Sequence, residues 1–396
     1  MTTDFKSLSE KLINSYAKLQ LSHSIKVAND IKPIQSTANR PVVNAIHSNV
    51  NYLLSHKDQK AIDAALDAID LAKIYENIDK LEQENEKEKD KKKGNEEEKQ
   101  EEEKQGKQGK ENKGATANLK YDDLVVKEIL RYFKHDFFEW VNTPKCSCGS
   151  DKAIGKGARR MPSTAPNPQK ISIIEVYECQ KCGKEIVFPR INNPVSLLET
   201  KKGRCGEWVN CFLLILEALI GDGGKDRVRF VWNQEDHVWV EYFSLGLQKW
   251  VHLDPCEAAF DEPLLYCENW GKKMSYVLGF NMNSVVDLSK KYITKEKQIP
   301  QQSIVDPKLV AKTLKWVNAR KLVQKYQNLK DQGFSDSDAL KLIYHEVIIP
   351  RNREQIALKE GDVKPSKTSL EGGNDVPRGR QTGSAEWTKA RGEDGH

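Results

Sequence analysis

The sequence predicts an α+β fold, and three features of its 396 residues support this prediction. The apolar stretch "RCGEWVNCFLLILEALIG" is typical of a buried helix, and Gly221 at its end is a suitable C-cap. The segments "RVRFVW", "HVWVEYF" and "KWVHLD" then follow the two-residue period of strands, with "SLGLQ" as a hairpin loop between the last two. Helical patterns resume beyond Asp306. A helix followed by antiparallel strands is therefore the expected core.

Residues 1–81 are expected to form an N-terminal helical region. A second helical stretch covers about 61–81, and the first is marked by apolar residues at three- and four-residue steps: Phe5, Leu8, Leu12, Tyr16 and Leu19.

Residues 82–118 are expected to be a charged, low-complexity linker. The segment "EQENEKEKDKKKGNEEEKQEEEKQGKQGKENKG" has no apolar side chains to bury, so it cannot offset the entropy of ordering. Positive and negative charges are interspersed, which argues against a nucleic-acid-binding arm.

The remaining chain divides into a core, a helical region and a tail. We expect the catalytic core at 119–300, opening with the amphipathic helix "YDDLVVKEILRYFKHDFFEW" and including a small lobe at about 141–190. C-terminal helices follow at 301–358, where Gly333 ends one helix and a Ser335–Asp338 capping box opens the next. The Gly/Ser/Pro-rich, charged residues 359–396 predict a disordered tail.

Composition narrows the class of protein. With 63 Lys+Arg against 58 Asp+Glu, the net charge of +5 gives no general case for nucleic-acid binding. The N-terminus lacks the apolar region of a signal peptide, and no run approaches the ~18 apolar residues that span a bilayer. We therefore expect a soluble, intracellular protein without membrane insertion, in which clustered cysteines bind metal or do chemistry.

Cys205 is the candidate nucleophile. It opens the core helix, where unpaired backbone N–H groups lower the pKa of a thiol, and Gly203 and Gly206 allow close approach of a substrate. Cys211 lies inside the same helix among apolar residues, where a small buried, inert side chain is the better interpretation.

A base and its orienting carboxylate are expected on neighbouring strands. His237 begins one predicted strand and Asp254 ends the next, so an antiparallel hairpin brings them to the same edge of the sheet. His252 is a rival, but it lies two residues before Asp254 on the same strand and cannot face it across the hairpin.

These motifs resemble a known family. The segments "GRCGEWVNCF", "RFVWNQEDHVWVEYF" and "KWVHLDPCEAAFDEPLLY" are similar to the core of the yeast-type cytosolic peptide:N-glycanases, which belong to the transglutaminase-like (papain-like) superfamily. The resemblance implies a transglutaminase-like fold and hydrolysis of the amide between an N-glycan and Asn on misfolded glycoproteins in ER-associated degradation. It implies Cys205 as nucleophile, His237 as base and then acid, and Asp254 as orienter, with Asn converted to Asp through a thioester.

Further roles follow from the resemblance. The Trp140 indole N–H is implied as an oxyanion donor beside the Cys205 backbone N–H, with core filling as an equal alternative. The resemblance also implies contacts to a chitobiose core, from Arg229, Trp239, Glu241, Trp250 and Glu257, with Trp270 a weaker candidate. For the tryptophans among them, the alternative is ordinary packing on the sheet.

Four cysteines suggest a structural zinc site. "KCSCGS" supplies Cys146 and Cys148, and "ECQKCGKE" supplies Cys179 and Cys182. Four thiolates suit a closed, tetrahedral Zn²⁺ site. The first knuckle is C-x-C where the family has C-x-x-C, so an empty or oxidised site is the alternative.

Two other classes of function remain open: a catalytically silent transglutaminase-like scaffold, and a cysteine protease or transglutaminase. The yeast-type resemblance also implies a proteasome shuttle factor with ubiquitin-like and ubiquitin-associated domains as a partner, bound by the N-terminal helix and a C-terminal one. The alternative is that the N-terminal helix covers the protein's own core. Residence in the cytoplasm, and also the nucleus, is expected.

Overall fold

The computed structural model describes residues 4–84, 86, 119–162, 164–221, 226–360 and 379–395. The expected linker at 82–118 lies outside the described residues except for 82–84 and 86, which continue a helix from residue 71. Residues 361–378 of the expected tail lie outside them as well.

A six-stranded antiparallel sheet forms the centre of the molecule, in the order β11-β10-β6-β7-β8-β9. The three strands expected from the period of two are all present, and their register brings the start of β7 beside the end of β8. The strands are β6 (Val228–Asn233), β7 (His237–Ser244), β8 (Lys249–Asp254), β9 (Ala259–Phe260), β10 (Val277–Phe280) and β11 (Val285–Asp287).

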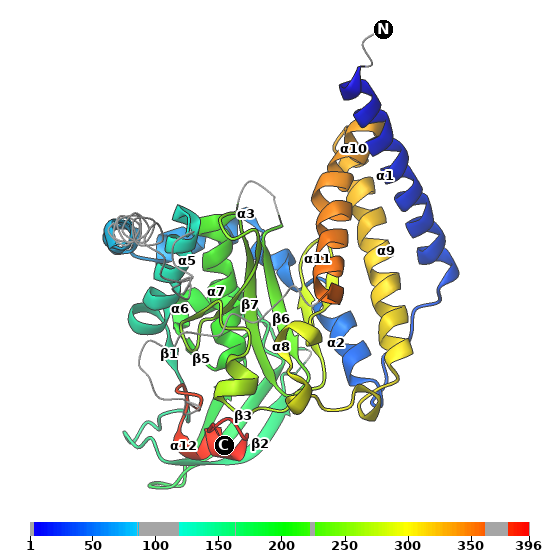
Figure 1. Ribbon diagram of the computed structural model, residues 1–396. Helices are drawn as coiled ribbons and strands as arrows, with labels where there is room; N and C mark the ends of the chain where they lie inside the picture. Colours follow the sequence, from blue (N-terminus) through cyan, green and yellow to red (C-terminus); the bar gives the residue numbers. More distant parts are fainter. Residues whose placement is uncertain are drawn as a thin grey trace, which may run out of the picture.

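The expected core helix is α7 (Cys205–Ile220), and it packs against one face of this sheet (Figure 1). Its apolar residues are almost completely buried, and Cys211 is 0% exposed among them, as predicted. Gly221 is the C-cap, as predicted. Glycine is needed at this position because a Cβ would lie 2.1 Å from the Glu217 carbonyl oxygen. Around α7 lie α3 (Gln59–Ala68), α5 (Tyr121–Tyr132) with its π-helical turn η3 (Phe133–Phe137), and α6 (Pro194–Thr200).

Two shorter sheets complete the core. β1 (Glu139–Trp140) pairs in parallel with β5 (Lys202–Gly203), directly before α7. β2 (Ala153–Arg160), β3 (Ile173–Cys179) and β4 (Glu185–Pro189) form the antiparallel sheet of the expected small lobe. Short turns follow the central strands: η4 (Leu265–Asn269), α8 (Ser289–Tyr292), η5 (Lys295–Lys297) and η6 (Gln301–Ser303).

The N- and C-terminal helices stand together beside the sheet (Figure 1). They share an apolar cluster in which Ala17 and Leu21 meet Leu322 and Leu340. Ser335 caps α10 as predicted, because its Oγ accepts from the Asp338 backbone N–H at 3.1 Å. The reciprocal half of the predicted capping box is replaced, because the Asp338 carboxylate accepts from the Ser335 hydroxyl at 2.6 Å. The helices are α1 (Phe5–Asp30), α2 (Pro41–Asn49), η1 (Tyr52–His56), α9 (Pro307–Asp331), α10 (Asp336–Ile343), η7 (Tyr344–Ile348) and α11 (Ile349–Glu360).

The tail differs from the expectation. Residues 379–395 contain α12 (Ala385–Ala390) and pack against the core, so the prediction of disorder is wrong for them. Composition indicated disorder because the segment has few apolar residues, but ion pairs to distant residues hold it in place, among them Lys272–Glu393. Among the described residues, no helix combines the length and the apolar character needed to cross a lipid bilayer.

Candidate active site and metal centre

Cys205 is the first residue of α7, and a charged network fixes this end of the helix. Arg204 is the N-cap, and its backbone N–H donates to Glu207 Oε2 at 3.1 Å. Arg190 holds the same carboxylate with two hydrogen bonds of 2.7 and 3.0 Å. A Cβ on Gly203 would lie 2.3 Å from Glu207 Cβ, so only glycine fits before the cap.

The small lobe holds the same helix start. The Arg204 guanidinium donates to the Tyr177 hydroxyl at 2.6 Å and pairs with Glu175 at 2.9 Å. Glu175 also pairs with Arg190 at 3.0 Å. Because Tyr177 and Glu175 lie on β3, which ends at Cys179, the cysteine-bearing lobe and the start of α7 are joined by side chains.

The electrostatic environment of the thiol differs from the expectation. Cys205 is half-buried, and burial raises the pKa of its thiol. The Arg380 guanidinium lowers this pKa and the Asp236 carboxylate raises it. The prediction of a lowered pKa considered only the helix terminus, and the loss of hydration outweighs it.

His237 and Asp254 meet as predicted. His237 Nε2 lies 2.9 Å from Asp254 Oδ2, and both side chains are 0% exposed. Asp254 also accepts from the Tyr266 hydroxyl at 3.0 Å and the Cys256 backbone N–H at 2.9 Å. Burial alone would raise the pKa of Asp254, but the hydrogen bond and charge of His237 hold it well below its usual range.

The second ring nitrogen of His237 is free to accept a proton. An ionised Asp254 only accepts hydrogen bonds, so Nε2 carries the proton and Nδ1 keeps its lone pair. Nδ1 is buried and has no hydrogen-bond partner among the described residues. Burial lowers the pKa of His237 more than Asp254 raises it, which favours the neutral imidazole that a base requires.

The rival histidine has a structural position. His252 Nε2 lies 2.7 Å from the Tyr266 hydroxyl, and its Nδ1 accepts from the Glu262 backbone N–H at 3.3 Å. Tyr266 therefore stands between His252 and Asp254. Burial lowers the pKa of His252 to about 3, so it stays neutral near pH 7.

The start of β7 meets the end of β8, and charged side chains close to this pair also influence Cys205 at the start of α7. The carboxylate of Asp236, the residue before His237, raises the pKa of the Cys205 thiol, and the Arg380 guanidinium lowers it. The charge of the Arg380 guanidinium also lowers the pKa of His237 and of Asp254. The thiol, the imidazole and the carboxylate thus share one charged neighbour.

Trp140 lies on the strand beside the start of α7, and its indole N–H is engaged. It pairs in register with Gly203, two residues before Cys205. Its Nε1 donates to Asn142 Oδ1 at 3.0 Å. Its role as an oxyanion donor stays a prediction that requires release of this hydrogen bond.

The five candidate sugar contacts fall into two groups. Trp239 and Glu241 are 0% exposed and Arg229 is 1% exposed. Arg229 forms ion pairs with Glu241 and with Glu354 of α11. Burial would raise the pKa of Glu241, but the charges of Arg229 and Lys291 outweigh it and lower this pKa to about 2. These three therefore present no surface to a sugar in this arrangement.

The other two candidates are half-buried. Trp250 carries the Arg229 guanidinium at 4.1 Å from its ring centroid. The Glu257 carboxylate accepts from the backbone N–H groups of Gln381 and Thr382 at 3.2 and 3.1 Å. Sugar binding stays a prediction for these two. Trp270, the weaker candidate, is 1% exposed, and its ring centroid lies 5.0 Å from that of His237.

Sequence reasoning missed two site residues, Arg380 and Tyr266. Tyr266 bridges His252 and Asp254 from η4, and no period of helix or strand marked it. Arg380 stands in the segment read as disordered tail, where a tryptophan and repeated arginines, "GRQTGSAEWTKARGEDG", were the available signal.

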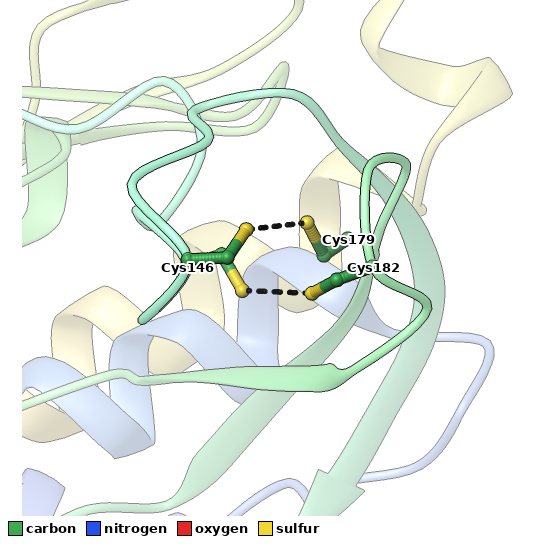
Figure 2. Close-up of side chains that lie close together, drawn as sticks. Cys146, Cys179 and Cys182 are labelled. Carbon is green, nitrogen blue, oxygen red and sulfur yellow. Dashed lines mark hydrogen bonds between the residues drawn. The ribbon is translucent and has the colours of Figure 1, made fainter.

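The four cysteines of the small lobe are gathered as predicted. Their Sγ atoms all lie within 4.8 Å of one another, with Cys146–Cys182 at 3.5 Å and Cys148–Cys179 at 3.6 Å (Figure 2). Zn–S bonds of about 2.3 Å place tetrahedral sulfurs about 3.8 Å apart, so the donor set fits a structural zinc ion. The shortened C-x-C knuckle still brings both of its sulfurs to the cluster.

A hollow of about 950 Å³ lies elsewhere, between α1, α9, α11 and the edge strand β11. Its lining includes neither Cys205 nor His237. The chemistry of the site therefore does not depend on this hollow.

Sequence comparisons with known proteins agree with this geometry. The profile described as the transglutaminase-like superfamily matches residues 158–255, and that of the Rad4 transglutaminase-like domain matches residues 226–339. The peptide-N(4)-(N-acetyl-beta-glucosaminyl)asparagine amidase of Candida albicans is 43% identical over 100% of this chain and 97% of its own length. Amidases of the same name from Debaryomyces hansenii and Saccharomyces cerevisiae are 44% and 35% identical, covering 99% of this chain and 98% and 97% of theirs.

Proposed function

The chain belongs to the family of peptide-N(4)-(N-acetyl-beta-glucosaminyl)asparagine amidases, and from this premise we propose that it hydrolyses the amide joining an N-glycan to asparagine. The observation that carries the proposal is the His237–Asp254 pair, whose buried Nδ1 has no hydrogen-bond partner in the described part of the chain, on a strand against which the helix opened by Cys205 is packed.

The first half of the reaction forms a thioester. His237 Nδ1 takes the proton of the Cys205 thiol, and Sγ attacks the carbonyl carbon of the asparagine side chain. A C–S bond forms, and the carbonyl electron pair moves to oxygen. The C–N bond then breaks as the imidazolium gives its proton to the departing glycosylamine.

The second half hydrolyses the thioester. His237 Nδ1 removes a proton from water, and the oxygen attacks the acyl carbon. The C–S bond breaks, the thiol is restored, and the peptide carries aspartate where asparagine stood. Asp254 holds the imidazole in the tautomer that both halves require.

The oxyanion formed in each half needs fixed donors. The Cys205 backbone N–H lies among the unpaired N–H groups at the start of α7 and is one donor. The Trp140 indole N–H is the second, after release from Asn142.

A structural zinc ion would be held by the cysteine quartet. Four thiolates would fill its coordination, so it would supply structural stabilisation and no catalytic position. Glu175 and Tyr177 on β3 carry that stabilisation to the start of α7 through Arg204.

The test is deglycosylation of a denatured N-glycoprotein. Peptide mass mapping should show Asn→Asp at the former glycosylation site, and Cys205→Ala should abolish the conversion. Cys211→Ala is the matched control, because it removes an inert thiol from the same helix, and it should keep activity if the variant folds.

Other outcomes identify the rival classes of function. A folded protein that leaves the glycoprotein unchanged would be a silent scaffold. Cleaved backbone would indicate a protease, and cross-linked product a transglutaminase.

We propose two kinds of protein partner. Misfolded N-glycoproteins of ER-associated degradation are the substrates, recognised at the chitobiose core and met in the cytoplasm and nucleus. A proteasome shuttle factor with ubiquitin-like and ubiquitin-associated domains is the second partner, bound by α1. One side of α1 covers the protein's own helices, while its other side is exposed: Phe5 78%, Leu8 47%, Leu12 62% and Leu19 63%.

Deleting residues 1–20 should abolish shuttle binding and spare deglycosylation. Because the deletion also removes packed residues, Leu12→Glu is a sharper variant that charges only the exposed side. Unchanged capture of the shuttle factor by both variants would refute this partner. Microscopy of a fluorescent fusion tests the compartment.

A further inference from the structure

Residues 379–395, the C-terminal segment, contact three parts of the active site. The Thr382 hydroxyl donates to the carbonyl of Cys256, two residues after Asp254, at 2.6 Å. The Ser384 backbone N–H donates to Asn142 Oδ1 at 2.9 Å, beside Trp140. The Gly395 N–H donates to the Trp270 carbonyl at 3.2 Å. Figure 1 shows the segment, in red with α12, at the lower end of the view, below β1 and β5.

The segment closes on itself and thereby fixes Arg380. The Arg380 backbone N–H donates to the Glu393 carbonyl at 2.7 Å, and Nη1 donates to Glu393 Oε2 at 2.9 Å. Glu393 also pairs with Lys272 of the core. A Cβ on Gly379 would lie 2.4 Å from the Asp394 carbonyl carbon, so the two strands of the loop touch at this glycine.

The Arg380 guanidinium is fully buried yet incompletely paired. Its side chain is 0% exposed and lies 5.0 Å from the ring centroids of both Trp140 and Trp270, and 4.7 Å from that of Trp387. Its Nε lies 3.9 Å from Glu257 Oε1, an ion-pair distance, but Nε and Nη2 have no hydrogen-bond partner among the described residues. Unpaired donors on a buried cation are costly, so a site that keeps them is expected to use the charge.

This position lies between the two halves of the catalytic machinery. Trp140 pairs in register with Gly203, next to the helix that Cys205 opens, and the Trp270 ring lies 5.0 Å from that of His237. Arg380 sits against both tryptophans. It is also the main charge that opposes the effect of burial on the pKa of Cys205.

We propose that Arg380 is a positioning residue of the active site, whose guanidinium the C-terminal segment places there to stabilise the Cys205 thiolate. The inference rests on the proposed function, in which that thiolate attacks the glycosylated amide. Burial alone would disfavour the charged sulfur, and a fixed buried cation restores it without any movement during the reaction.

The opposite interpretation is a plug. The segment binds the Glu257 carboxylate, a candidate sugar contact, so it could instead block substrate. The two interpretations predict opposite results for a chain that ends at residue 378: loss of activity if the segment supplies Arg380, and a gain if it blocks the site.

The test measures thiol reactivity directly. Cys205 is alkylated with iodoacetamide from pH 5 to 10 and followed by peptide mapping in wild type, Arg380→Gln and Arg380→Lys. Loss of the guanidinium should raise the apparent pKa of Cys205 by about one unit or more, and lower its alkylation rate at pH 7 about tenfold. Deglycosylation should fall at least tenfold, and Arg380→Lys should recover most of both.

The sign of the shift separates the electrostatic role from a structural one. If the substitution only released the segment, the thiol would gain water and its pKa would fall. Lys389→Gln is the matched control, because it removes an exposed charge from the same segment and should leave the profile unchanged.

Two results would overturn the inference: an unmoved or lowered pKa in Arg380→Gln, or higher deglycosylation by the chain ending at residue 378. A wild-type chain that does not deglycosylate, but whose thiol still shifts with Arg380→Gln, would refute the proposed function instead.

Discussion

The tautomer of His237 can be reversed by one substitution, Asp254→Asn. Asp254 Oδ1 accepts from the Cys256 backbone N–H at 2.9 Å, while Oδ2 lies 2.9 Å from His237 Nε2. Oδ1 also accepts from the Glu257 backbone N–H at 3.4 Å, and these two backbone donors cannot turn away, so the amide oxygen of asparagine takes their side. Its NH₂ group then faces His237 Nε2 and donates to it, while the Tyr266 hydroxyl, which donates to Oδ2 at 3.0 Å in the wild type, rotates its proton away. The ring proton then moves to Nδ1, which can no longer accept the proton of Cys205.

The expected cost follows from the loss of the base. Reversing the tautomer in a triad of this kind lowers kcat by up to about 10⁴-fold, and each factor of ten is about 1.4 kcal/mol of activation free energy. A thiol needs less help than a serine hydroxyl, so we expect a fall of about 10³ to 10⁴, or about 4 to 5.5 kcal/mol. The side chain is nearly isosteric, so the fold should be kept.

The assay is the initial rate of Asn→Asp conversion in a glycopeptide, with the fold checked by circular dichroism. His252→Gln is the matched control, because it changes the neighbouring histidine, which contacts Tyr266 instead of Asp254. It should keep the rate within about tenfold. A folded Asp254→Asn chain that loses less than tenfold in rate would refute the assigned tautomer and the role of Nδ1.

Three further predictions concern metal, stability and pH. Cys182→Ser should lower the zinc content measured by native mass spectrometry. Because side chains of β3 contact the start of α7, it should also lower kcat/KM at least tenfold. Full activity of a zinc-free variant would contradict this coupling. Glu207→Gln should cost about 2 kcal/mol of unfolding free energy in urea, since it removes the ion pair of the buried Glu207 carboxylate with Arg190 and leaves Arg190 with Glu175 alone; a change under 0.5 kcal/mol, roughly a surface effect, would oppose it. Burial lowers the pKa of His56 to about 4, so its contribution to stability is complete above pH 6.5 and is lost as pH falls toward 4. Between pH 7 and 5 this loss is about 2 kcal/mol, and His56→Gln should abolish that part of the pH dependence; an unchanged slope would show that other groups cause it.

The parts of the site that could be predicted depend on short-range patterns. Strand periodicity located β7 and β8, and antiparallel pairing then brought His237 to Asp254 without any knowledge of the rest of the chain. The cysteine quartet could be predicted in the same way, because each of its two knuckles, with two sulfurs apiece, is recognisable from a short stretch of sequence. The apolar run of α7 predicted both the helix and the burial of Cys211.

The parts that could not be predicted depend on contacts between distant segments. Arg229 of β6 forms an ion pair with Glu354 of α11, and no local pattern links these residues. The C-terminal segment is ordered by Glu393, which pairs with Lys272 and Arg380 across the chain. The pKa of Cys205 reflects burial by the assembled core and not only the helix terminus at which the thiol stands.

Cys205 is the proposed nucleophile that forms a covalent thioester with the substrate, and rapid acid quenching tests this directly. A glycopeptide is mixed with excess protein, quenched within the first turnover and mapped by mass spectrometry. We predict an acyl adduct on the Cys205 sulfur whose mass is that of the peptide without its glycosylamine. An adduct on another cysteine, or first-turnover deglycosylation by Cys205→Ala at the wild-type rate, would contradict it.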